Sequence, residues 1–181
     1  MLRWRMNDLQ VVTGFAERLR ALIPDMLIRN GELVPSAFVY AQRRPNNFPD
    51  PTAVFPAMIP LMANMLPNGV LLDKDTFFAL VRAAAKETEA SAVVTVQEAW
   101  VYSASIHEPI VRASTHKDRK EIVVVYMEHK ALPGLVMWVA DIQRDAEGNP
   151  SLSEFQTVSD GHDHSVEVFI RMLPVDPKSV N

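Results

Sequence analysis

The sequence predicts an α+β fold in a single domain of 181 residues, with two or three helices packed on a mostly antiparallel sheet of five or six strands. The second half of the chain contains closely spaced segments rich in Val, Ile and aromatic residues. Two stretches in the first half show helical periodicity. Most connections between the apolar segments are too short to hold a crossover helix, so we expect the strands to pair mainly antiparallel.

The strands are expected mainly between residues 93 and 173. The four segments are 93–103, 121–130, 135–144 and 165–173. Turn residues bound three of them, for example Pro133 and Gly134. A further strand is expected at 33–42, and Pro35 near its start predicts an edge position because proline cannot donate to a neighbouring strand. Both faces of the 93–103 and 121–130 segments are rich in apolar residues, which predicts burial on both sides.

Two helices are expected, at 8–23 and 73–89. In the first, apolar residues recur at steps of three and four and form a stripe that needs a covering layer; its members are Leu9, Val12, Ala16, Leu19 and Ile23. Asp73 is the expected N-cap of the second helix. Leu72 before it and Phe77 after it have the spacing of a hydrophobic staple.

The segment 44–70 is irregular, rich in proline and methionine, and unusually apolar for a loop. Its prolines exclude a long helix or a central strand. One interpretation is a cover over one end of the core, with one or two helical turns near 57–66. The other is a surface for association, in which Phe55, Met58 and Met62 supply the contacts and the methionines adapt their shape.

The composition excludes several classes of function but does not identify the function of this chain. The net charge of −4 and the absence of a basic arm argue against nucleic-acid binding. The chain has no cysteine, which excludes disulfides and thiolate metal sites and fits a reducing compartment. No signal peptide or membrane-length apolar run is visible, so we expect a cytoplasmic protein without a membrane partner. No cofactor-binding motif is present, and no cofactor is expected.

Ionisable residues are densest in the connection 104–120, between two predicted strands. Long polar loops on a rigid sheet often carry binding sites. We expect a ligand-binding cluster of Glu98, His116, Arg119 and Glu121, since the last three lie close together in sequence and Glu98 shares a strand face with large apolar side chains. The alternative is a charged loop held by surface ion pairs that contribute about 0–1 kcal/mol each.

His162 and His164, in a turn with neighbouring aspartates, form a second candidate site. Imidazoles two residues apart in a turn can bind one metal ion. No second ligand pair with zinc spacing follows, and glycine and aspartate simply favour turns, so no metal is assigned.

The leading functional hypothesis is a non-enzymatic protein that acts by association, either as a homo-oligomer or as an accessory subunit of another protein. It is based on strands that are apolar on both faces and on the apolar segment 54–66. The alternative is a small enzyme or ligand-binding protein that uses the 104–121 loop with Glu98, or a metal at His162 and His164.

Overall fold

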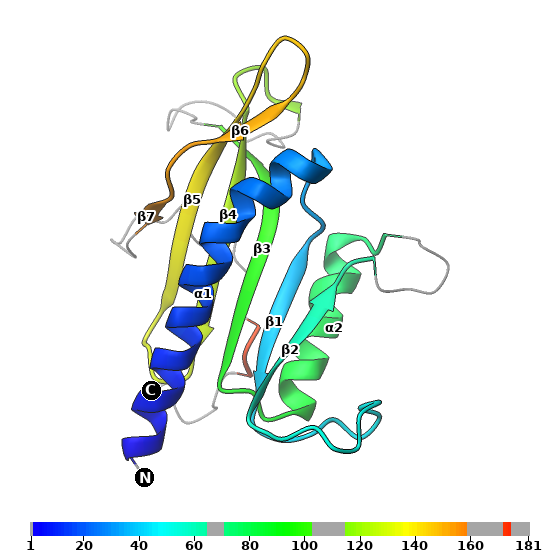
Figure 1. Ribbon diagram of the computed structural model, residues 1–181, viewed down its shortest axis with the longest axis vertical. Coiled ribbons are helices and arrows are strands. Elements are labelled where there is room, and N and C mark those ends of the chain that lie inside the picture. The colour runs from blue at the N-terminus through cyan, green and yellow to red at the C-terminus, as the bar shows by residue number, and fades with distance from the viewer. Residues whose placement is uncertain (1, 65–70, 103–114, 159–171, 175–181) are drawn as a thin grey trace.

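A computed structural model describes residues 2–64, 71–102, 115–158 and 172–174 of the chain (Figure 1). This part contains two helices and seven strands, which confirms the predicted α+β class with an antiparallel sheet. The elements are α1 (Leu2–Asn30), β1 (Ser36–Ala41), β2 (Ala57–Met62), α2 (Lys74–Glu87), β3 (Ala92–Val101), β4 (Lys120–His129), β5 (Leu135–Arg144), β6 (Pro150–Leu152) and β7 (Gln156–Val158).

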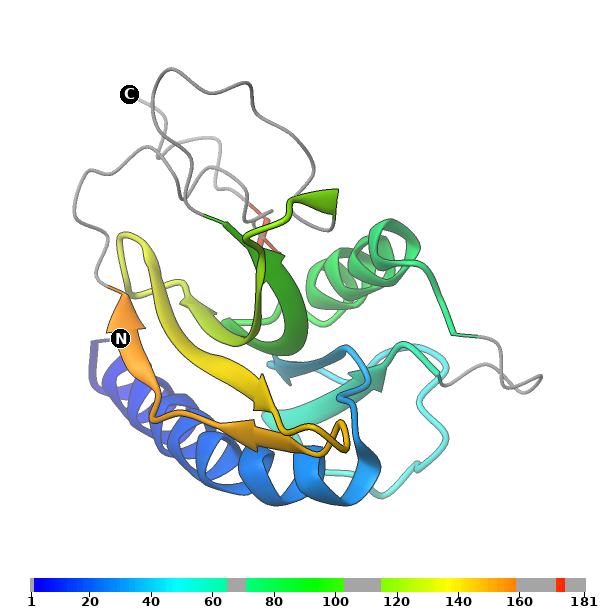
Figure 2. The same ribbon diagram turned by 90° about the horizontal axis from the view of Figure 1, so that it is seen from above.

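The sheet runs in the order β2-β1-β3-β4-β5-β6, and β7 pairs with β5 beside β6. Every described pairing is antiparallel. The view from above shows α1 on one face of the sheet and α2 on the other (Figure 2). The predicted burial of both strand faces is therefore confirmed, with one helix on each side.

Alternation along the strands divides the core into two layers. On β3, Val94 and Val96 belong to the layer under α1, whereas Val93 belongs to the layer under α2. On β4, Val123 and Val125 face α1. The two layers fix which side chains can meet at any site on the sheet.

Helix α1 is longer than the predicted 8–23 segment at both ends, since it begins at Leu2 and continues through Pro24 to Asn30. The buried stripe contains Val12, Ala16, Ile23 and Leu27. Extending the stripe to Leu27 stabilises the final turns despite the hydrogen bond that proline cannot make. Gly31 ends the helix at φ +75° and donates its N–H to the carbonyl oxygen of Leu27 at 2.8 Å.

Helix α2 begins where its sequence predicts. The Asp73 carboxylate accepts hydrogen bonds from the Thr76 N–H at 3.0 Å and the Thr76 hydroxyl at 2.6 Å. The helix ends at Glu87, close to the predicted end, and Glu89 then adopts a left-handed φ of 53°. Phe77, Phe78, Val81 and Ala85 are buried against the sheet.

Two predictions about the first half of the chain are wrong. The expected helical turns near 57–66 are replaced by β2, which includes Pro60 and lies at the edge of the sheet. The strand after Pro35 is not an edge strand: β1 lies between β2 and β3, because Pro35 precedes the paired residues and leaves every N–H of the strand in place. Strands β6 and β7 were not predicted.

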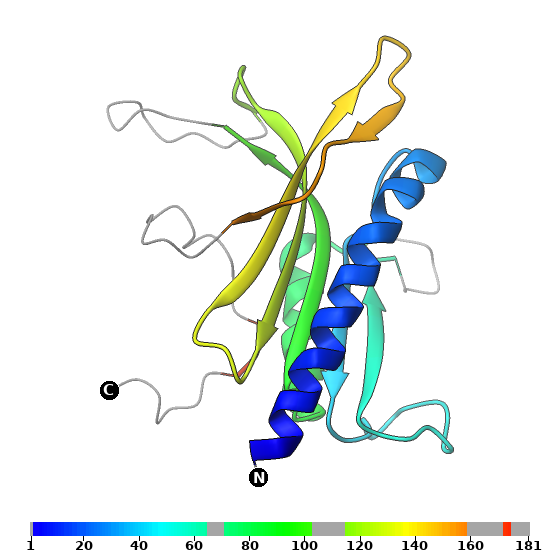
Figure 3. The same ribbon diagram turned by 60° about the vertical axis from the view of Figure 1, so that its left-hand side comes forward.

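The β5–β6 hairpin extends beyond the sheet beside the C-terminal end of α1 (Figure 3). The predicted strand 165–173 lies outside the described residues up to 171, and Met172 and Leu173 are not in a strand. Their backbone N–H groups donate to the Glu128 carboxylate at 2.7 and 3.0 Å. This carboxylate fixes the 172–174 segment to β4 on the α2 side.

Candidate functional site

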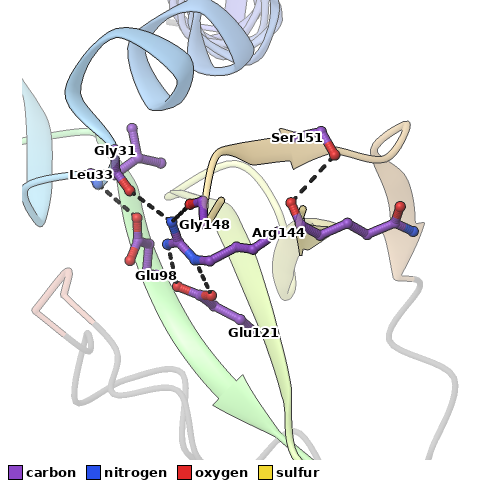
Figure 4. Close-up of polar contacts among 8 residues, drawn as sticks. Gly31, Leu33, Glu98, Glu121, Arg144, Gly148 and Ser151 are labelled. Carbon is purple, nitrogen blue, oxygen red and sulfur yellow. Dashed lines mark hydrogen bonds and ion pairs between the residues drawn. The ribbon is translucent and has the colours of Figure 1, made fainter. Parts of the chain in front are cut away.

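Glu98 lies near the end of β3 on the face that α1 covers. Its carboxylate accepts a hydrogen bond from the Leu33 backbone N–H at 2.7 Å, which joins β3 to the segment that follows α1 (Figure 4). The side chain is half-buried. Burial raises the pKa of Glu98 above its usual value, and the nearby Glu121 carboxylate acts in the same direction, whereas the Leu33 N–H opposes the shift.

Glu121 opens β4 on the same face and forms a two-point ion pair with Arg144. The guanidinium donates Nη2–H and Nε–H to the two carboxylate oxygens at 2.8 and 2.9 Å (Figure 4). Arg144 Nη1 also donates to the carbonyl oxygens of Gly31 at 3.2 Å and Gly148 at 3.5 Å. One guanidinium therefore joins β4, β5, the end of α1 and the β5–β6 turn.

Arg119 and His116 lie near this cluster but have different partners. The Arg119 guanidinium lies 4.8 Å from the ring centroid of Trp100, which is directly opposite Glu121 on β3. The His116 ring stacks on Tyr102 at 4.1 Å, and its Nδ1 accepts the Asp118 N–H at 3.1 Å. Of the four predicted residues, Glu98 and Glu121 come together on one face, Arg119 lies beside them over Trp100, and His116 is separate. Residues 104–114 of the predicted loop lie outside the described part of the chain.

The opposite face of the sheet contains a cavity of about 520 Å³ that the sequence did not predict. It lies over β4 and β5, at the end where β3 finishes. The floor is formed by apolar side chains, and three charged side chains surround its mouth; the described lining residues are Val101, Tyr102, Asp118, Lys120, Ile122, Val124, Met137, Val139 and Asp141. A volume of this size is within the range of small-molecule sites.

The mouth of the cavity carries two carboxylates and one ammonium group. Lys120 Nζ lies 4.0 Å from the Asp141 carboxylate, and both side chains are substantially exposed. Asp118 makes no ion pair or side-chain hydrogen bond with the described residues. The predicted strand 121–130 already placed Ile122 and Val124 on one face, whereas Lys120 was assigned to the preceding loop and is the first residue of β4.

Polar side chains are buried on the same face as the cavity. Gln97 lies directly opposite Val124, and its buried Oε1 atom has no hydrogen-bond partner among the described residues. Thr95 and Tyr126 form the next cross-strand pair. Burial raises the pKa of Tyr126 to about 12, so its hydroxyl stays protonated at neutral pH. Two charged side chains also act on this pair: the Glu128 carboxylate raises the pKa of Tyr126, and the Arg82 guanidinium lowers it.

The predicted association residues lie at the edge of the sheet. Met58 and Met62 are on the face of β2 that points toward the α1 side, on either side of Pro60. Phe55 precedes β2, and its ring lies 5.6 Å from that of Phe48. Met58 and Met62 therefore share a surface, and Phe55 belongs to the adjoining loop.

That surface continues onto β1 and α1. Phe38 is the cross-strand partner of Pro60, and its ring lies 4.9 Å from that of Phe15. Several apolar side chains of α1 on the Phe15 side remain exposed, namely Val11 (44 %), Leu22 (56 %) and Met26 (40 %). We call these residues together the α1–β2 surface: Val11, Phe15, Leu22, Met26, Phe38, Met58, Pro60 and Met62.

The histidine pair at 162 and 164 lies outside the described residues. Within the part of the chain that is described, no group of three or more His, Asp or Glu side chains is placed to hold a metal ion. The described helices include none that is both long and apolar enough to cross a membrane.

Comparison of the chain with protein-family models, curated protein sequences and solved structures finds no significant match. The function is therefore inferred from the side chains and surfaces of this chain alone.

Proposed function

We propose that the protein acts by association with a second copy of itself through the α1–β2 surface. The observation that carries the proposal is the exposure of Leu22, Met26 and Val11 beside an apolar strip of β1 and β2 that α1 leaves uncovered (Figure 1). Monomeric proteins rarely expose contiguous apolar patches of large size, and such patches commonly mark interfaces. Methionine side chains suit this role because they adapt to the shape of a partner.

The edge of β2 favours pairing through side chains rather than through the backbone. Pro60 faces Phe38 in the register and has no N–H to donate to it, so this pair is a non-hydrogen-bonded one and the Pro60 backbone points outward. The free edge of β2 therefore lacks a backbone N–H donor at Pro60, which disfavours addition of another strand. Association is therefore proposed on the face of β2 and the flank of α1.

The charged side chains next to the α1–β2 surface favour a two-fold symmetric contact between the α1 helices of two copies. Arg18 and Asp25 are exposed on the flank that carries Leu22, and neither forms an ion pair with the described residues. If two α1 helices cross antiparallel about an axis near Leu22, Arg18 of one copy lies level with Asp25 of the other. The same contact then forms twice, as an isologous interface requires.

Sedimentation velocity at micromolar concentration tests the proposal. We expect a dimer for the unmodified chain and a monomer for Leu22→Asp or Met26→Asp. Ile28→Asp is the matched control: Ile28 is 61 % exposed on the same helix but points away from the surface, so the dimer should persist.

Charge reversal tests whether the partner is a second copy. Arg18→Glu and Asp25→Arg should each weaken the dimer, and the double variant should restore it because the exchanged charges again meet across the two-fold axis. A monomeric unmodified chain, or a dimer that Leu22→Asp leaves intact, contradicts the proposal.

A further inference from the structure

We propose that the cavity over β4 and β5 binds a small amphipathic amine, with its apolar body on the sheet and its ammonium group at Asp118. The site lies on the α2 face, away from the α1–β2 surface, and does not depend on the association proposed above. Its volume of about 520 Å³ accommodates a molecule of small-ligand size.

The apolar floor of the cavity favours a ligand with a hydrocarbon body. Ile122 and Val124 on β4 and Met137 and Val139 on β5 form a continuous apolar area, because these residues alternate onto one face in neighbouring strands. Val101 at the end of β3 extends it. Hydrocarbon that binds there leaves water, which contributes about 25 cal/mol for each Å² buried.

The charged side chains at the mouth of the cavity favour a ligand with a cationic head. Asp141 already lies near Lys120, whereas the Asp118 carboxylate has no such partner among the described residues. The Asp118 carboxylate can only accept hydrogen bonds, and an ammonium group offers only donors.

An anionic head fits the mouth less well. It would meet one ammonium group, that of Lys120, against the carboxylates of Asp118 and Asp141. Like charges at short range disfavour such a ligand, whereas a cation gains from both carboxylates. The site therefore discriminates by the charge of the head as well as by the fit of the body.

Calorimetric titration with octylamine, octanol and octanoate at neutral pH separates the contributions of body and head. These probes share one hydrocarbon chain and differ in the charge of the polar end. We expect octylamine to bind about tenfold more tightly than octanol, in line with one charge-assisted hydrogen bond, and octanoate to bind most weakly. Equal affinity for octylamine and octanol, or tightest binding of octanoate, overturns the proposal.

Two variants locate the site. Asp118→Asn should lower octylamine affinity about tenfold and leave octanol affinity unchanged, and Glu147→Gln, at an exposed carboxylate outside the cavity, should change neither. Val139→Phe should abolish binding of both probes by filling the cavity, and an unchanged thermal unfolding transition would show that the variant folds. Octylamine binding that survives Val139→Phe, or that Asp118→Asn does not weaken, overturns the proposal.

Discussion

Glu98 is a half-buried carboxylate that joins two separate segments of the chain. It shares the α1-facing side of β3 with Val94 and Val96, where a charged group loses much of its hydration. The Leu33 N–H at 2.7 Å compensates part of that loss, and Arg144 lies near enough to contribute a further favourable charge. The remaining imbalance raises the pKa of Glu98, because desolvation is the largest influence.

The raised pKa of Glu98 predicts a pH-dependent difference between the unmodified chain and Glu98→Gln. The folded state holds the proton more tightly than the unfolded state, whose carboxyl titrates near 4.5. As the pH falls through the raised pKa toward 4.5, the unmodified chain should gain unfolding free energy relative to Glu98→Gln, whose amide oxygen can still accept the Leu33 N–H. Urea unfolding at a series of pH values measures this difference.

The control for this series is Glu147→Gln, because Glu147 is exposed in the β5–β6 turn. The free energy of unfolding of Glu147→Gln should follow that of the unmodified chain across the pH series. A Glu98→Gln variant whose stability also runs parallel to the unmodified chain would show that Glu98 titrates alike in the folded and unfolded states.

At the scale of elements, the sequence predicted best where local signals agreed with tertiary burial. Asp73 caps α2 as its position between Leu72 and Phe77 indicated, and β3, β4 and β5 lie within or close to the apolar runs. Strand β2 was missed because the prolines of the 44–70 segment suggested irregular backbone, although an edge strand tolerates a proline such as Pro60 where its nitrogen points outward. Strands β6 and β7 contain three residues each, too few for periodicity to show.

The candidate sites were only partly predictable for a related reason. Alternation places Glu98 and Trp100 on one face of β3, as the sequence indicated, whereas Lys120 was assigned to the loop and lies in β4 on the face of Ile122. Which face α1 covers, and where a cavity remains on the α2 side, depends on contacts between segments far apart in the chain. The cavity therefore could not be derived from local patterns.

The attachment of α2 gives a prediction at this scale. Phe77 is 1 % exposed within the layer that also holds Val39 and Val93. Phe77→Ala should lower the free energy of unfolding by about 3–5 kcal/mol, because it removes a buried ring and leaves a cavity. Leu80→Ala, at a position 50 % exposed on the same helix, should change it by no more than about 0.5 kcal/mol. Urea unfolding at neutral pH measures both, and similar losses for the two variants would contradict the observed orientation of α2.

At the scale of the whole molecule, the two proposed binding regions use opposite faces of one sheet. The α1–β2 surface lies on the α1 side at β1 and β2, and the cavity lies on the α2 side over β4 and β5. Strand β3 and its neighbours separate them, and the close-packed layers on both faces give the sheet little freedom to shift. The proposed dimer contact and the proposed ligand therefore do not compete for the same surface.

The separation predicts that dimerisation and amine binding are thermodynamically independent. Coupling between two sites requires that each ligand bind two states of the molecule with different affinities, and the coupling free energy must be equal in both directions. Leu22→Asp should therefore abolish the dimer and leave octylamine affinity within about twofold, the limit expected for a coupling free energy close to zero. Saturating octylamine should leave the dimer dissociation constant of the unmodified chain unchanged in sedimentation. A change of fivefold or more in either measurement, with the reciprocal change in the other, would show instead that the two faces are coupled through the central strands.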